Sequence, residues 1–274
     1  MKRKAVILAA GRGSRLGELS QNTPKPLLPV NGIKGGPSFL DWHLYCLAMA
    51  SVSEVILVGN HVTFGAELNR VDGLIVEWVL NPAEDLSLSG SAHSLWYGFQ
   101  KENGFLDNES AILFMDADIM YEPSLPGNIF LSLQDSSLIG IHSKYHENDE
   151  EVLVFSKNQR PLALGKGLLN SVITEDMHCE GEALGMVLIH PHDHVFVSGA
   201  LDWLTRFSTA KARSEHEDLS ALMMRSNLLS PFALPSSSLF MEVDFSGDYE
   251  RLKNELFPEV KKLLPREALS RLNL

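Results

Sequence analysis

A glycine-rich, basic segment near the start of the chain has the residue types needed to bind phosphate. Gly11 and Gly13 follow an apolar run, Ala5–Leu8, that predicts a buried strand. A strand that opens into a glycine-rich loop can present backbone N–H groups to a polyphosphate. Arg15 and Lys25 add fixed positive charge to a chain that is otherwise acidic. A nucleoside triphosphate is therefore the ligand that this segment predicts.

Two familiar phosphate-binding loops do not fit this segment. The Walker loop requires a lysine directly after its second glycine, and no lysine follows Gly17. The dinucleotide loop requires a third glycine where Leu16 stands, and its acidic residue about 20 positions further on is also missing. The alternative is an ordinary glycine-rich turn. Arg15 and the stiff segment Pro24–Pro26 favour the phosphate site.

The pieces Leu8–Arg15 and Pro24–Val30 resemble, in order and distance, the signature of the nucleotidyltransferases related to sugar-nucleotide pyrophosphorylases, which have a GT-A-type fold. These enzymes join a nucleoside triphosphate to a phosphate-bearing partner and release pyrophosphate. The resemblance implies catalytic roles for Lys25, at the nucleophile and α-phosphate, and for Arg15, at the leaving pyrophosphate. Its nucleotide-binding candidates in the first loop are Leu8, Ala9, Ala10, Gly11, Arg12, Gly13 and Ser14.

Two carboxylates stand where an apolar strand, Ala111–Met115, is predicted to end. Asp116 and Asp118 are two positions apart, so in an extended segment they point to the same side. Like charges so close together are costly unless a cation or hydrogen bonds compensate them. Phosphoryl chemistry on a nucleotide needs a hard cation such as Mg²⁺, which carboxylates bind. The alternative is a polar transition from strand to loop.

The resemblance implies a metal-ligating aspartate after a central strand and another before a helix near the C-terminus. Asp118 and Asp244 match these positions, which leaves Asp116 to face the nucleotide sugar or to support the metal ligands. The Trp-x-Asp-Ile-Asp segment of the relatives appears here as Phe240–Asp244, with Glu242 in place of the first aspartate.

The small polar residues Ser89, Gly90 and Ser91 are candidates to bind the nucleotide base, because the nucleotidyltransferases read the base with the loop at this point. Ser91 could equally cap the helix that follows. The same stretch resembles a loop of bacterial phosphocholine cytidylyltransferases, with which it shares Ser94-Leu95. This resemblance favours CTP.

Two later segments also resemble cytidylyltransferases that act on alcohol phosphates and phosphonates. Gly181–Gly185 is similar to their Gly-Glu-x-x-Gly segment, and Glu215–Asp218 is similar to their Tyr-Glu-Asp segment, with His216 in place of the tyrosine. Acidic side chains near aromatic groups suit an acceptor that carries an amine or a quaternary ammonium group, although Glu217 and Asp218 could equally be first-turn acids of a helix. The acceptor-binding candidates are Lys166, Glu182, Glu217 and Asp218.

The chain's 274 residues include 23 basic and 35 acidic side chains, which give a net charge of −12. An acidic surface repels nucleic acids and anionic membranes, so we expect small-molecule partners. Cys46 and Cys179 have no metal-binding spacing and suit a reducing compartment. No apolar run reaches the roughly 20 residues that span a membrane, and the first run is too short for a signal peptide. We therefore expect a cytoplasmic protein, as a monomer or homodimer.

Apolar segments alternate with helical patterns, which predicts an α/β fold: a doubly wound, mostly parallel mixed sheet flanked by helices, Rossmann-like as in the nucleotidyltransferases. In such sheets ligands bind beyond the carboxyl ends of the strands, where the glycine loop and Asp116–Asp118 would lie. We expect one domain over 1–274, with a nucleotide-binding half over 1–135 and an acceptor-binding lobe over 136–274. The predicted strands are Ala5–Leu8, Glu54–Val58, Leu74–Val79, Ala111–Met115, Ser137–His142, Glu151–Phe155, Ala183–Ile189 and Leu239–Val243. The predicted helices are Ser38–Ala50, Thr63–Arg70, Ser91–Lys101, Leu201–Phe207, Glu217–Ser226 and Asp248–Leu256.

The reaction that these residues predict is attack by a phosphate or phosphonate oxygen on the α-phosphorus of a nucleotide, with pyrophosphate as the product. We expect CTP as the nucleotide, Mg²⁺ as the cofactor, and a small phosphonate or phospho-alcohol such as phosphocholine or 2-aminoethylphosphonate as the acceptor. One alternative is a sugar-1-phosphate nucleotidyltransferase that uses UTP, dTTP or GTP. Another is a nucleotide-binding module without catalysis.

Overall fold

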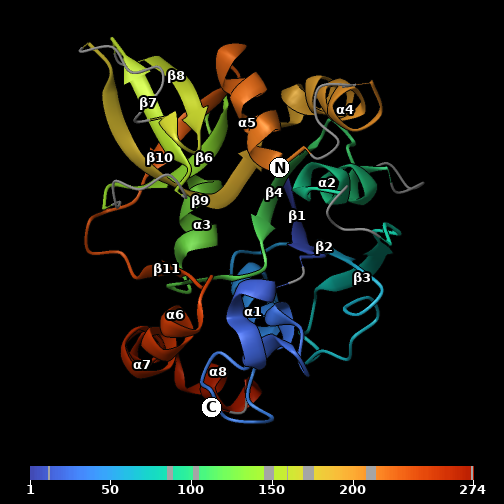
Figure 1. Ribbon diagram of the computed structural model, residues 1–274, viewed down its shortest axis with the longest axis vertical. Helices are drawn as coiled ribbons and strands as arrows, with labels where there is room; N and C mark the ends of the chain where they lie inside the picture. The colour runs from blue at the N-terminus through green and yellow to red at the C-terminus, as the bar shows by residue number, and fades with distance from the viewer. Residues whose placement is uncertain are drawn as a thin grey trace.

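A nine-stranded mixed sheet runs through the centre of the molecule (Figure 1). The computed structural model describes residues 1–11, 13–84, 89–100, 105–144, 151–158, 160–168, 176–207, 214–272 and 274. The main path of the sheet has the order β10-β6-β9-β4-β1-β2-β3, and β7 and β8 extend it beside β9. The strands are β1 Lys2–Ala9, β2 Glu54–Gly59, β3 Ile75–Leu80, β4 Ser110–Asp116, β6 Ser137–His142, β7 Leu153–Lys157, β8 Arg160–Gly165, β9 His178–Ile189 and β10 Leu229–Ala233.

Strands β1 to β4 are parallel, whereas β9 runs antiparallel to β4, β6 and β7. This arrangement confirms the predicted mixed α/β fold with a mostly parallel central region. Leu8 at the end of β1 lies beside Asp116 at the end of β4. The loops that follow these two strands therefore leave the sheet at the same edge.

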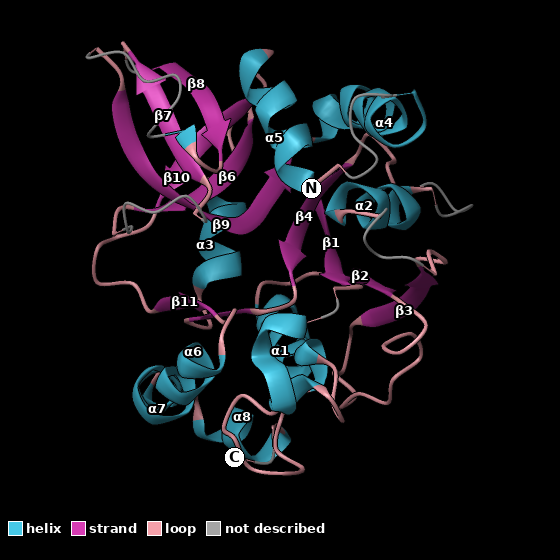
Figure 2. Ribbon diagram, viewed as in Figure 1, coloured by secondary structure: helices cyan, strands magenta, loops and turns pink. Residues whose placement is uncertain are grey.

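Helices cover both faces of the sheet (Figure 2). Ala5, Ile7 and Ala9 pack into one apolar layer with α1 and the C-terminal helices, and Val6 and Leu8 pack into a second layer with α2, α4 and α5. Alternate side chains of a strand point to opposite faces, so a strand that is apolar throughout must be covered twice. The helices are α1 Phe39–Met49, α2 Ser91–Phe99, α3 Leu125–Leu131, α4 His194–Asp202, α5 His216–Arg225, α6 Ser246–Arg251, α7 Phe257–Lys262 and α8 Arg266–Arg271. Among the described residues, none of these helices is long and apolar enough to cross a membrane.

The helix predicted over Thr63–Arg70 is wrong, because this segment is the end of a turn followed by an irregular loop. The Asn60 side chain accepts hydrogen bonds from the backbone N–H groups of Val62 and Thr63. The Thr63 hydroxyl donates to the carbonyl of Ala9 at 3.0 Å. Side-chain bonds of this kind compete with a helix, and here they anchor the end of β1 instead.

Strand β10 lies at one end of the sheet and was not predicted. Pro231 interrupts its pattern, and proline is tolerated in strands mainly at such edges because it cannot donate a ladder hydrogen bond. Strand β8 was also missed.

A separate two-stranded ribbon connects the middle of the chain with its C-terminal part. Strand β5, Ile119–Tyr121, pairs antiparallel with β11, Phe240–Glu242. The N–H of Val243 then donates to the carbonyl of Asp118 at 3.0 Å. This ribbon brings the two aspartates expected to bind metal, Asp118 and Asp244, to the same place.

His43 on α1 supports the segment between β4 and β5 from inside the core. Its side chain is fully buried, with Nε2 3.2 Å from the carbonyl of Ala117 and Nδ1 2.9 Å from the hydroxyl of Tyr121. Because a carbonyl only accepts, Nε2 carries the proton and Tyr121 donates to Nδ1. Burial of the ring lowers the pKa of His43 to about 4.

This lowered pKa predicts a loss of stability in acid. Between pH 6.5 and about 4, the unfolded chain binds a proton at His43 that the folded chain does not bind. The free energy of unfolding should therefore fall by up to about 1.4 kcal/mol per pH unit in this window through His43. Urea unfolding of wild type and His43→Gln at several pH values measures this term as the difference between their slopes. A matched His192→Gln variant on the surface should keep the wild-type slope, and identical slopes for wild type and His43→Gln would contradict the prediction.

Candidate active site

A cleft of about 930 Å³ opens at the edge of the sheet where β1 and β4 end. It brings together residues from the first loop, the segment after β3, the ends of β4 and β8, the start of α5 and the segment after β11. The candidate residues that line it are Leu8, Ala10, Gly11, Gly13, Ser14, Arg15, Lys25, Ser89, Gly90, Ser91, Asp116, Asp118, Lys166, Glu217, Asp218 and Asp244.

Three candidates stand apart from this group. Ala9 is fully buried, and its carbonyl accepts the Thr63 hydroxyl. Arg12 lies outside the described residues. Glu182 on β9 lines a neighbouring hollow that shares Asp116 and Lys166 with the main cleft.

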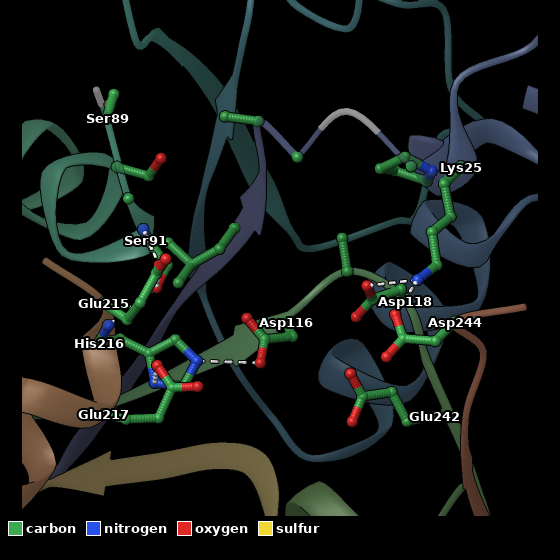
Figure 3. A pocket seen from close by; sticks show the side chains of 18 of the residues that line it. Lys25, Ser89, Ser91, Asp116, Asp118, Glu215, His216, Glu217, Glu242 and Asp244 are labelled. Atoms are coloured by element: carbon green, nitrogen blue, oxygen red, sulfur yellow. Dashed lines mark hydrogen bonds and ion pairs between the residues drawn. The ribbon is translucent and has the colours of Figure 1, made fainter. Parts of the chain in front are cut away.

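Lys25 lies between the two aspartates that were expected to bind metal. Its Nζ is 2.8 Å from Asp118 Oδ2 and 3.0 Å from Asp244 Oδ1 (Figure 3). The Lys25 side chain is only 6% exposed. Burial lowers the pKa of Lys25, but the two carboxylates outweigh burial and raise it above the usual value. The ammonium group is thus a permanent positive charge, and Lys25 is not a solvated surface lysine.

The backbone around Lys25 explains how this side chain is held. Lys25 stands between Pro24 and Pro26 and is the first residue of a short 3₁₀ turn, Lys25–Leu27. Both prolines restrict the backbone around it. Gly13 in the first loop has φ +60° and packs against the lysine stem, where a Cβ would lie 2.8 Å from Lys25 Cβ. The glycine therefore allows the loop and the lysine to approach each other.

Glu242 joins Asp118 and Asp244 in a cluster of carboxylates. One oxygen from each of the three side chains lies within 4.8 Å of the others. Desolvation by the cleft and the charges of Asp118 and Asp244 raise the pKa of Glu242 well above its usual value. Hard oxygen donors so close together form a set that suits a divalent cation such as Mg²⁺. Glu242 was not among the predicted ligands, although its position two residues before Asp244 on an extended segment is a signal that points to it.

Arg15 stands at the outer side of this cluster. Its Nη1 lies 3.3 Å from Asp244 Oδ2, and its guanidinium packs over the ring of Phe245 at 5.7 Å. The Arg15 side chain is about half exposed, so its charge faces the open part of the cleft.

The loop after β3 is tied to the start of α5. The backbone N–H and hydroxyl of Ser91 both donate to Glu215 Oε2, at 2.7 and 2.8 Å. Asn81 Nδ2 donates to the hydroxyl of Ser89 at 3.0 Å. Gly90 occupies the cap position of α2 and Ser91 is its first residue, so the alternative in which Ser91 caps this helix is wrong. These bonds fix one wall of the cleft.

Asp116 lies between this wall and the Lys25 cluster (Figure 3). Its Oδ2 is 3.0 Å from Nε2 of His216, a side chain that is 8% exposed. Burial opposes a charge on the His216 ring, but the carboxylates of Asp116 and Glu217 and the hydrogen bond to Asp116 raise its pKa to about 10. The ring is therefore an imidazolium at neutral pH and forms an ion pair with Asp116.

The described lining of the cleft carries more negative than positive charge. Its four basic side chains are Arg15, Lys25, Lys166 and His216. Its seven carboxylates are Asp116, Asp118, Glu215, Glu217, Asp218, Glu242 and Asp244. A polyphosphate would be repelled by this excess unless a further cation accompanies it. The charge balance thus agrees with the donor set for a divalent metal.

The hollow beside the main cleft has an acidic character of its own. Burial, and the nearby charge of Glu151, raise the pKa of Glu182 to about 7.

Glu217 and Asp218 lie in the first turn of α5, and Asp218 Oδ2 accepts the N–H of Glu215 in a capping box. Glu217 and Asp218 therefore both face the cleft and occupy the first turn of the helix, as each of the two alternatives predicts.

A family model for the MobA-like NTP transferase domain matches residues 5–240. The chain belongs to this family.

Its similarity to solved structures extends over almost the whole chain at low sequence identity. It resembles the inositol-1-phosphate CTP transferase from T. maritima with a TM-score of 0.69 and 15% identity, over 96% of each chain. It also resembles a Bacillus anthracis protein described as a glucose-1-phosphate thymidylyltransferase, with a TM-score of 0.67 and 14% identity over 92% and 94% of the two chains. These neighbours agree on the fold.

Two relatives share more sequence over shorter segments. The MobA-like chain is 36% identical to the CMP-5′-(3-aminopropyl)phosphonate synthase of Streptomyces rubellomurinus over 125 residues, which are 44% of this chain and 18% of that protein. It is 43% identical to the N-acetylmuramate α-1-phosphate uridylyltransferase of Neisseria meningitidis serogroup B over 70 residues, which are 26% and 28% of the two chains. The matches thus span less than a third of either relative.

Gly185 provides a test of how tightly the site is built. Its φ is +63°, and a Cβ there would overlap Asp116 Oδ2. Gly185→Ala should lower the free energy of unfolding by about 2 kcal/mol or more, from backbone strain together with this overlap. Gly65→Ala has a similar φ of +74° in open space, so it should cost about 1 kcal/mol. Chemical denaturation measures both variants, and equal losses would contradict the close packing of Asp116.

Proposed function

We propose that this protein is a Mg²⁺-dependent nucleotidyltransferase that couples CTP to a small phosphonate or phospho-alcohol and releases pyrophosphate. The observation that carries the proposal is the convergence of Lys25 with Asp118 and Asp244 beside a glycine loop, in a chain of the NTP transferase family. Positive charge, metal-type carboxylates and backbone donors at one strand edge are the components that nucleotidyl transfer requires.

The reaction forms a bond from an acceptor oxygen to the α-phosphorus and breaks the bond from this phosphorus to the bridging oxygen of the β-phosphate. The electron pair of the broken bond leaves with pyrophosphate. The acceptor oxygen is already an anion, so the protein needs no general base, and catalysis depends on positioning and on neutralising charge. Lys25 binds the α-phosphate and the incoming oxygen, and Arg15 stabilises the pyrophosphate.

Asp118 and Asp244, with Glu242 beside them, would hold the metal ion. The ion supplies charge neutralisation for the phosphates. Because Lys25 contacts the same two aspartates, a metal ion bound there would repel its ammonium group, which would then turn toward the nucleotide phosphates. Lys25 and the metal are in this sense competitors for one pair of side chains.

The choice of CTP and of an amine-bearing acceptor rests on several features. The relative from Streptomyces is named as a CMP-aminopropylphosphonate synthase, and a structural neighbour is named as a CTP transferase. The hollow beside the cleft contains Glu182, whose raised pKa would fall when an ammonium group binds next to it. An acceptor such as 2-aminoethylphosphonate or phosphocholine would fit this chemistry, with Lys166 at its phosphonate or phosphate.

A sugar-1-phosphate acceptor with UTP, dTTP or GTP is the second candidate. It is favoured by the 43% identity to a uridylyltransferase over 70 residues. The same residues would catalyse both reactions, so the substrates distinguish them.

Pyrophosphate release tests the proposed function directly. Purified protein with Mg²⁺ is assayed with each of four nucleoside triphosphates against 2-aminoethylphosphonate, phosphocholine and a panel of sugar 1-phosphates. We expect turnover with CTP and an aminophosphonate or phosphocholine, and a loss of at least about a hundredfold in Lys25→Ala because its transition-state contact is removed. Lys34→Ala on the surface should keep wild-type turnover. Tight nucleotide binding without turnover for any pair would favour a binding module, and activity of Lys25→Ala within about threefold of wild type would exclude its catalytic role.

Direct binding of Mn²⁺ tests the metal site without turnover. In calorimetry without nucleotide, Asp244→Asn should weaken Mn²⁺ binding, because one charged ligand is lost. Lys25→Ala should tighten it, because the ammonium no longer competes for the two aspartates. Asp135→Asn on the surface serves as the control and should bind like wild type. Unchanged affinity in both site variants would remove this cluster as the metal site.

A further inference from the structure

One buried charged side chain, His216, contacts two parts of the cleft and has no part in the reaction described above. Its Nε2 bonds Asp116 Oδ2 at 3.0 Å, and its backbone N–H donates to the hydroxyl of Ser91 at 2.8 Å. The same residue thus connects the end of β4 with the loop expected to bind the base. This juxtaposition is long-range, because Asp116 and His216 are 100 positions apart in the chain.

The orientation of the His216 ring is fixed on several sides. It packs edge-on against Phe114, with centroids 5.5 Å apart and planes at 65°. Phe114 precedes Asp116 by two positions on β4, so both side chains lie on the same face of the strand. Nδ1 of the ring lies 3.7 Å from Glu217 Oε2, and both atoms are buried without a hydrogen-bond partner among the described residues. A ring confined in this way holds the carboxylate that it bonds.

The bonded carboxylate is also enclosed from the opposite side. Gly185 on β9 approaches Asp116 so closely that a Cβ would overlap Oδ2. Oδ2 is therefore occupied by His216 and shielded by Gly185. In the part of the chain that the structure describes, no hydrogen bond engages the second oxygen, Oδ1, and Asp116 lines the cleft.

Asp116 stands at the position that a nucleotide sugar would reach. Figure 3 shows it between Ser89 and Ser91 on one side and Lys25 with Asp118 on the other. If the base lies at the serine loop and the phosphates lie at Lys25, the ribose must cross the space beside Asp116. A carboxylate oxygen accepts hydrogen bonds from ribose hydroxyl groups, and a bond to a charged acceptor is among the stronger ones.

We propose that His216 is a positioning residue that orients the Asp116 carboxylate to bind the ribose hydroxyl groups of the nucleotide. The inference rests on the proposed function, since it requires a nucleotide in the cleft. The ring takes one oxygen of the carboxylate and leaves the other for the sugar. Its positive charge also offsets the carboxylate, which would otherwise stand uncompensated beside the triphosphate.

Two substitutions separate the hydrogen bond from the volume of the ring. His216→Gln keeps an N–H donor at a similar reach toward Asp116, whereas His216→Phe keeps a ring of similar size and loses the donor. Asp116→Asn leaves His216 in place and removes the charged acceptor. His192→Phe is the matched control, because His192 is exposed on the short turn before α4.

The experiment is calorimetric binding of CTP, 2′-deoxy-CTP and 3′-deoxy-CTP in the presence of Mg²⁺ and without acceptor. Wild type should bind CTP about tenfold more tightly than at least one deoxy analogue, the size expected for one hydrogen bond to a charged group. His216→Gln and His192→Phe should keep this discrimination, and His216→Phe and Asp116→Asn should lose it. In steady-state assays, His216→Phe should raise the KM for CTP more than it lowers kcat.

The outcomes separate this role from the proposed function. Wild type that binds CTP but does not discriminate against either deoxy analogue would overturn the ribose role alone. Discrimination that persists in His216→Phe or in Asp116→Asn would overturn it as well. If His216→Phe does not fold, as judged by its thermal unfolding, the Asp116→Asn result decides. Wild type that binds no nucleoside triphosphate would overturn the proposed function, and this role with it.

Discussion

The ion pairs of Lys25 with Asp118 and Asp244 are the interaction on which the rest of the cleft depends. Three segments that are distant in sequence meet at the ammonium group of Lys25, whose side chain is 6% exposed. A charge buried to this degree is stable only with partners, because its removal from water costs several kcal/mol. The carboxylates repay this cost, and the lysine in turn reduces the repulsion between them. The site is thus held in shape before any substrate binds.

The backbone makes this convergence possible by two separate means. Parallel pairing of β1 with β4 brings the glycine loop and Asp116 to one edge of the sheet. The β5–β11 ribbon then carries Asp244 across to Asp118, and its last hydrogen bond joins Val243 to the carbonyl of Asp118. His43 supports the same segment from the core through the carbonyl of Ala117. The edge of the sheet that carries the cleft is therefore connected to the hydrophobic core.

The parts of the fold that follow from local pattern could be predicted from the sequence. Apolar runs located β1, β2 and β4, and strand β6 coincides with its predicted range, Ser137–His142. Because carboxyl ends of parallel strands meet, the sequence also placed the first loop and Asp116 on one edge. The prediction of a helix over Thr63–Arg70 was wrong because hydrogen bonds of the Asn60 and Thr63 side chains determine the backbone conformation at the start of that segment.

The contacts between distant segments could not be predicted in the same way. The role of Asp244 came from a resemblance, since no local pattern specifies that β11 pairs with β5. The contact between His216 and Asp116 could not be predicted either, because nothing in the sequence around a histidine at a helix start identifies a partner 100 positions away. Glu242 differs from both, because its position two residues before Asp244 is evident in the sequence. It was not predicted as a ligand because the relatives have an aspartate at this position.

The two buried cations of the cleft, Lys25 and His216, are complementary rather than redundant. Lys25 neutralises Asp118 and Asp244, and in the proposed reaction it would exchange these carboxylates for substrate phosphates. His216 neutralises Asp116 at the middle of the cleft, and it is enclosed by Phe114 and Glu217, so it stays where it is. A movable cation suits a position where charge develops during the reaction, and a fixed one suits a position that only orients the ligand. The proposed reaction therefore explains why the two side chains differ. Lys25 would have to move as charge develops on the phosphates, whereas His216 would only have to hold Asp116 in place.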